Sequence, residues 1–195
     1  MTLRRATLHR TTSETDIQLT LCLDGGEARI QTGLGYFDHM LMQLARHGRF
    51  GLEIEAKGDL HVDSHHLIED VGLCLGDALR EALGERRGIA RWGEAHVPMD
   101  ETLARVVVDL SGRPYCVFQA ELPKLILGDG FQTEMVREFF IALSMRGQLN
   151  LHAAVLYGEN THHQIEALFK GLARALKQAV CMDSDAIPST KGTLT

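Results

Sequence analysis

Apolar and polar residues alternate over the first thirty positions, a pattern typical of half-buried β-strands. Ile17, Leu19, Leu21 and Leu23 alternate with polar or small residues, and Asp24-Gly25-Gly26 then supplies a hairpin turn. From about residue 65, apolar residues recur instead at the three- and four-residue spacing of a helix. The pattern predicts strands over residues 4–10, 15–23, 27–31 and 50–56, and helices over 36–46 and from 65 onward.

The second half of the chain repeats much of this order. Strands are predicted over 103–110, 115–120 and 149–157, and helices over 131–146 and from Thr161, which has capping-box spacing with Gln164. Each half then follows the order strand–strand–helix–strand–helix, and a boundary near residues 92–97 predicts units of 1–92 and 93–195. Right-handed crossovers would place both helices of a unit on one face of a mixed sheet. The predicted fold class is therefore α+β, with two tandem pseudo-symmetric repeats that pack helix layer against helix layer.

A His-His-x-x-Glu motif opens the last predicted helix of each half. The two copies are His65, His66 and Glu69, and His162, His163 and Glu166. Residues 65–79 and 162–176 are identical at seven of fifteen positions, which indicates a duplicated unit. On a helix, the first His and the Glu share a face, whereas the second His is turned by about 100° toward another partner. Two copies of this nitrogen and oxygen donor set predict a pair of divalent transition ions. One copy alone would be read more simply as solvated histidines.

Composition excludes several classes of function. Of the 195 residues, 45% are hydrophobic and 24% are charged, and the net charge of −6 argues against a nucleic-acid partner. The four cysteines form no C-x-x-C pair, which favours a reducing compartment. No apolar run reaches the length of a membrane span, and the first residues lack the apolar stretch of a signal peptide. We therefore predict a cytoplasmic protein with no membrane partner.

Further candidates come from the repeat and from turns that carry cations. Aligning the first helices of the two halves pairs His39 with Glu138, so each half gains one more candidate metal ligand. Arg113 in Ser-Gly-Arg-Pro and Lys191 in Ser-Thr-Lys-Gly combine a cation with hydroxyls and turn N–H groups, which favours phosphate binding. Arg91 is a third candidate cation.

Glu14 follows Thr11-Thr12-Ser13 at the start of a predicted strand. The residues alone leave two interpretations of it open, a general base or an exposed acid.

Several ordered motifs resemble the imidazoleglycerol-phosphate dehydratase family. They are the stretches Arg10-Thr11-Thr12-Ser13-Glu14-Thr15, Phe37-Asp38-His39-Met40, Asp63 to Asp70, Asp109 to Pro114, Gly158 to Leu176 and Pro188 to Gly192. Together they run through the whole chain. The resemblance implies paired α+β repeats of the ribosomal protein S5 domain 2-like class, two manganese ions per active site, and a 24-subunit shell with sites between subunits.

The resemblance also implies roles for particular residues. Metal ligands would be His39, His65, His66, Glu69, His162, His163 and Glu166, with Glu138 as a further candidate. Substrate contacts would be Glu14, Arg91, Arg113, Ser189 and Lys191. The groups expected to take part in catalysis are Glu14, His65, Glu69, His163 and Glu166. Two positions depart from the family: Leu67 stands where Thr is common, and Glu138 stands where many members have a metal-binding His.

The activity implied is loss of water from imidazoleglycerol phosphate to give imidazoleacetol phosphate, in histidine biosynthesis. Two metals beside the imidazole would favour its imidazolate form, which can expel the neighbouring hydroxyl, and Glu14 is the candidate for proton transfer. Two alternatives remain open. One is a metal-storage shell without catalysis, and the other is a dimetal hydrolase. The storage protein would leave the Arg113 and Lys191 turns without a purpose.

Overall fold

The first half of the molecule is one four-stranded sheet with two helices. In the computed structural model, which describes residues 3–194, the strands of this half are β1 (Arg5–Thr11), β2 (Thr15–Cys22), β3 (Ala28–Gln31) and β4 (Gly51–Gly58). The helices are α1 (Gly35–Gly48) and α2 (His65–Leu83). The sheet order is β1-β2-β4-β3, with β3 parallel to β4 and the other pairs antiparallel. It is therefore a mixed sheet, as predicted.

The second half repeats this topology. Its strands are β5 (Trp92–Met99), β6 (Thr102–Asp109), β7 (Tyr115–Gln119) and β10 (Asn150–Tyr157), and its helices are α3 (Met135–Gly147) and α4 (Thr161–Ala179). The sheet order β5-β6-β10-β7 matches that of the first half strand for strand. A two-stranded hairpin of β8 (Ile126–Leu127) and β9 (Phe131–Gln132) lies between β7 and α3.

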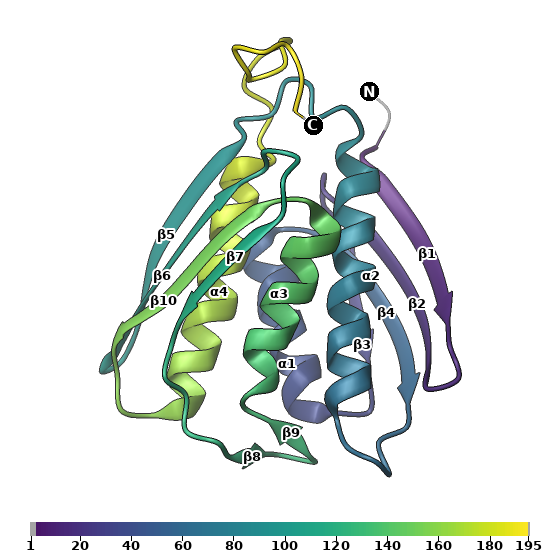
Figure 1. The fold of residues 1–195 in the computed structure, drawn as a ribbon, viewed down its shortest axis with the longest axis vertical. Coiled ribbons are helices and arrows are strands. Elements are labelled where there is room, and N and C mark those ends of the chain that lie inside the picture. The colour runs from purple at the N-terminus through teal and green to yellow at the C-terminus, as the bar shows by residue number, and fades with distance from the viewer. Residues whose placement is uncertain (1–2, 195) are drawn as a thin grey trace.

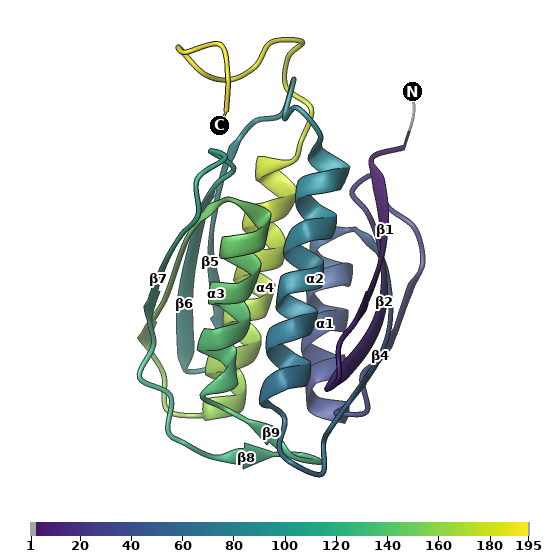
Figure 2. The ribbon, with the colours of Figure 1, turned by 45° about the vertical axis from the view of Figure 1, so that its right-hand side comes forward.

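The four helices lie between the two sheets, so the molecule has four layers (Figures 1 and 2). α2 packs against α3 and α1 packs against α4, which joins the halves through their helix layers. A Cβ at Gly76 of α2 would lie 2.7 Å from the Gly147 nitrogen and 2.8 Å from the Leu143 carbonyl oxygen of α3. Glycine therefore lets these two helices approach closely. The predicted α+β class and the packing of helix layer on helix layer are confirmed.

Some predicted boundaries were wrong. The order strand–strand–helix–strand–helix was one strand short for each half. In the first half β1, β2 and β3 all precede α1. In the second half β5 is a full strand where only a boundary was predicted, and the β8–β9 hairpin adds two short strands before α3. The helix predicted over 131–146 begins four residues later, at Met135. Thr133 causes this shift, since its hydroxyl donates to the Pro123 carbonyl and accepts from the Leu125 amide, which holds the preceding residues in the hairpin. The division of the chain into 1–92 and 93–195 stays a prediction.

Within residues 3–194, no helix is both long and apolar enough to cross a membrane.

Candidate metal and phosphate sites

One histidine cluster joins the two halves of the chain. His39, near the start of α1, and His162, on the first turn of α4, both direct Nε2 at the same oxygen, Oε2 of Glu166. The distances are 3.1 Å from His39 and 3.0 Å from His162. The three ligand atoms lie within 4.8 Å of one another. α1 and α4 pack together, so the helix packing itself creates this convergence.

The carboxylate of Glu166 is the buried centre of the cluster. Only 7% of its side chain is exposed, and its second oxygen, Oε1, lies 2.6 Å from Lys170 Nζ. Burial by itself would raise the pKa of Glu166, but the hydrogen bonds from Lys170 and the two imidazoles outweigh burial and hold that pKa below its usual value. The group is therefore an anion at neutral pH. Two imidazole nitrogens and one carboxylate oxygen are donors that suit a divalent transition ion.

A second cluster lies at the start of α2. Nε2 of His65 is 3.6 Å from Oε2 of Glu69, one helical turn further on, and both side chains are about half exposed. His66 points elsewhere: its Nδ1 lies 3.0 Å from Asp59 and 3.7 Å from Glu14. The expectation that adjacent histidines face different partners is thus confirmed. The hydrogen bond between His66 and Asp59 outweighs the effect of burial and raises the pKa of His66.

His163 repeats the geometry of His66 in the second half. Its Nδ1 lies 2.8 Å from Oε2 of Glu101, in the turn between β5 and β6. Asn160 begins the helix, with its side-chain oxygen accepting from the His162 and His163 amides. Gln164 instead donates to the Gly158 carbonyl, so the predicted capping box between Thr161 and Gln164 was wrong.

The predicted phosphate residues line one pocket at the C-terminal tail. Arg91, Arg113, Ser189 and Lys191 all contribute to a hollow of about 540 Å³. Arg91 bonds both carboxylate oxygens of Asp109 and donates from Nη1 to the Pro188 carbonyl, at 2.7 to 3.1 Å. Arg91 therefore fixes the tail from which Ser189 and Lys191 project.

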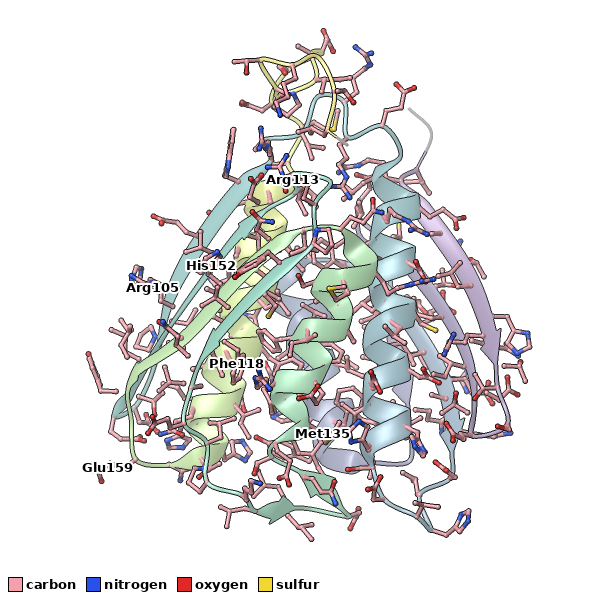
Figure 3. The ribbon with its side chains drawn as sticks, in the orientation of Figure 1. Arg105, Arg113, Phe118, Met135, His152 and Glu159 are labelled. Atoms are coloured by element: carbon pink, nitrogen blue, oxygen red, sulfur yellow. The ribbon has the colours of Figure 1, made fainter. Side chains whose placement is uncertain are left out.

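The phosphate pocket and the histidine clusters lie at opposite ends of the molecule. The Arg91 amide donates to the Ala179 carbonyl at the end of α4, while His162 lies at its start. Seventeen residues of helix separate those ends, or about 26 Å at the helical rise per residue. Figure 3 shows Arg113 beside the C-terminal tail and Glu159 next to the start of α4, at the other end. One small phosphate ester cannot reach both sites of one chain.

Comparison with known proteins places the chain in a family. The family model for imidazoleglycerol-phosphate dehydratase matches residues 32–176. The chain belongs to this family. It is 56% identical over 195 residues to the imidazoleglycerol-phosphate dehydratase of Lacticaseibacillus casei, a match that covers 98% of this chain and 100% of that protein. The corresponding protein of Bacillus cereus is 54% identical over 195 residues, with the same coverage. The chain is accordingly an enzyme of the hydro-lyase class.

Solved structures agree with this assignment. The crystal structure of the imidazoleglycerol-phosphate dehydratase of Staphylococcus aureus has a TM-score of 0.83 and 41% identity, and the match covers 91% of this chain and 99% of that one. The enzyme of Pyrococcus furiosus, solved in complex with (S)-C348, has a TM-score of 0.82 and 40% identity, over 96% and 100% of the two chains.

The structure brings some predicted ligands together and leaves others apart. His39, His162 and Glu166 form the one such group of three among residues 3–194. Packing of the two helix layers therefore brings candidate ligands from both halves together within one chain. Glu138 does occupy the position in α3 that His39 has in α1, because both helices end at a glycine followed by a residue with positive φ, Arg49 or Gln148. Its carboxylate lies 3.5 Å from Arg137 and joins no ligand group.

Several residues of the site were not identified from the sequence. Lys170 could have been found, since it follows Glu166 by one helical turn. Glu101 could have been found through the repeat, because it immediately precedes β6 as Glu14 immediately precedes β2. Asp59 has no such signal, and its role depends on the loop that folds it toward His66.

Proposed function

We propose that the chain dehydrates imidazoleglycerol phosphate to imidazoleacetol phosphate, as a manganese-dependent cytoplasmic enzyme of histidine biosynthesis. The observation that carries the metal dependence is the convergence of His39, His162 and Glu166, since an anionic buried carboxylate beside two imidazole nitrogens is a ready ligand set. Membership of the dehydratase family supports the substrate and the reaction.

Two ions would be held by the two His-His-x-x-Glu clusters. His39, His162 and Glu166 would contribute to one set, and His65, His66, Glu69 and His163 supply the remaining donors, with Glu138 still a candidate. When bound, the ions would supply Lewis-acid polarisation of the substrate's imidazole. The ring nitrogens and carboxylates of this chain would orient that ring.

Glu14 is the candidate for proton transfer. It would take the proton from the carbon next to the one that loses its hydroxyl group. Its side chain is about half exposed at the tip of the β1–β2 hairpin, 3.7 Å from His66. The hairpin is fixed beneath it, because Thr12 Oγ1 accepts from the Glu14 and Thr15 amides, and Thr15 Oγ1 donates to Asp70 at 2.5 Å. A carboxylate that is exposed but held in place suits a general base.

Arg113, Ser189 and Lys191 would bind the substrate's phosphate, while Arg91 holds the tail in position. Because the phosphate pocket and the histidine clusters of one chain are about 26 Å apart along α4, we infer that each active site combines the pocket of one subunit with the clusters of others. The site then requires a homo-oligomer, for which a 24-subunit shell is the proposed form.

A direct assay tests the reaction. Protein stripped with EDTA should be inactive on imidazoleglycerol phosphate, and Mn²⁺ should restore formation of the ketone. A metal-storage protein would bind Mn²⁺ without consuming the substrate, whereas a dimetal hydrolase would release inorganic phosphate. Full activity in rigorously metal-free protein would overturn the metal-dependent mechanism, and no ketone from Mn²⁺-loaded, assembled protein would overturn the function.

A further inference from the structure

Glu101 makes more hydrogen bonds than its exposed position in a hairpin turn would suggest. Its Oε1 accepts from the Thr102 hydroxyl at 2.8 Å and from the Glu159 and Asn160 amides at 3.1 and 2.8 Å. Its Oε2 lies 2.8 Å from His163 Nδ1. The two oxygens therefore have separate roles, since one holds the loop before α4 and the other faces the histidine.

A carboxylate can only accept hydrogen bonds, so His163 must carry its proton on Nδ1. In the neutral ring the other nitrogen, Nε2, which lies 3.7 Å from Asp100, then carries the lone pair. Three donors on Oε1, two of them backbone amides, hold the Glu101 side chain in the acceptor form that faces His163.

We propose that Glu101 is a positioning residue, which fixes His163 in the tautomer and orientation that offer Nε2 to a metal ion. This inference rests on the proposed function, in which His163 is a ligand. Carboxylates that accept from the far nitrogen of a ligating histidine commonly play this part in metal sites.

The first half of the chain reaches the same arrangement with different residues. His66 Nδ1 lies 3.0 Å from Asp59, the residue that follows β4. In the second half the residue that follows β10 is Gly158, which has no side chain, and the loop to the helix is three residues long instead of six. Glu101 supplies the missing carboxylate from the neighbouring hairpin. The two halves thus make the same carboxylate–histidine contact with residues at different positions of the repeat. This indicates that the second histidine of each motif needs a carboxylate partner.

Glu101→Gln separates the two roles of the side chain. A glutamine has one carbonyl oxygen, and three donors at the Oε1 position would retain it there. Its NH₂ group would then face His163 Nδ1, which favours the opposite tautomer with the proton on Nε2. The variant should keep its loop and its fold, shift His163 to that tautomer, and bind Mn²⁺ about 10–100-fold more weakly.

The measurements are ¹⁵N NMR of histidine-labelled, metal-free protein, Mn²⁺ titration, and thermal unfolding. The spectra are taken at mildly alkaline pH, where imidazole is neutral. His163→Ala assigns the His163 signals. Asp100→Asn is the matched control for the tautomer, because that side chain is 81% exposed in the same turn and lies 3.7 Å from the other ring nitrogen, Nε2. It removes a nearby charge without touching the Nδ1 contact and should leave the tautomer unchanged.

The outcomes separate this inference from the proposed function. Wild-type His163 protonated on Nε2 would overturn the inference even if Glu101→Gln failed to fold. If His163→Ala loses Mn²⁺ binding but Glu101→Gln binds Mn²⁺ as tightly as wild type, the inference is overturned and the proposed function stands. A His163→Ala variant that binds Mn²⁺ as wild type does would show that the proposed ligand set is wrong, and the inference would fall with it.

Discussion

The separation of the two candidate sites makes a quantitative prediction about mixtures of inactive variants. Glu14 lies beside His66 at the start of α2, and Lys191 lies in the pocket beyond the end of α4. Glu14→Gln and Lys191→Ala each remove one candidate active-site group and neither changes a predicted metal ligand. Both variants should therefore assemble, and each should lose most of its activity by itself.

In an equal mixture that assembles at random, each site would take Glu14 from one chain and Lys191 from another. Each of the two groups is then wild type in about half of the sites, independently of the other, so about one quarter of sites are complete if the two groups come from different subunits. If both groups of a site came from one chain, no site would be complete.

Because the proposed sites lie between subunits, we expect metal-free protein to dissociate into smaller oligomers. The metal-free variants should therefore be mixed, reassembled with Mn²⁺ and assayed for ketone formation. Variants that are assembled separately and then mixed serve as the control and should stay inactive. Light scattering confirms that both samples have the mass of the assembled particle. Co-assembled particles of full mass that show only the summed activity of the two variants would refute the shared site.

Three further predictions address phosphate binding, packing and pH. Lys191→Ala should weaken binding of inorganic phosphate in a titration while Mn²⁺ content stays at the wild-type level; unchanged phosphate affinity would mean that the pocket is not the anion site. Gly76→Ala should destabilise the fold by about 1–3 kcal/mol in urea unfolding, because its Cβ would meet the Gly147 backbone at 2.7 Å; wild-type stability would contradict this packing argument. Asp24→Asn should cost about 1 kcal/mol at neutral pH, since Arg4 outweighs burial and lowers the pKa of Asp24. A carboxyl whose pKa is lowered by folding stabilises the fold at pH values above its unfolded-state pKa of 3.8. That stabilisation is lost as the pH falls through the folded-state pKa, so the difference in stability between the variant and wild type should vanish in acid.

The sequence predicted the fold where periodicity and repetition agreed. The alternation around Ile17 placed β2 within one residue, and the helical spacing after His65 placed the start of α2. β5 was missed because Gly93 and Pro98 weaken its strand signal, although its alternating burial is regular. The start of α3 was misplaced because only the tertiary bonds of Thr133 end the preceding hairpin.

For the site, the sequence identified residues but not their arrangement. The repeat pointed to His39, and packing of α1 against α4 then brought it to Glu166. No local pattern contains that contact, because the two residues are 127 positions apart. The same holds for His163 and Glu101, which come from a helix and a hairpin 62 positions apart.

The two repeats use one hairpin position in opposite ways. Glu14 and Glu101 each precede the second strand of their half. Glu101 accepts four hydrogen bonds, whereas within residues 3–194 the Glu14 carboxylate makes only a 3.7 Å contact with His66. The difference follows from the loop that precedes the His-His-x-x-Glu helix. In the first half that loop carries Asp59, which accepts from His66 and leaves Glu14 at the rim. In the second half Gly158 follows the strand where the first half has Asp59, and Glu101 contacts the histidine instead. A carboxylate already held by four donors is a poor proton acceptor, so only the first repeat can offer this position as a base.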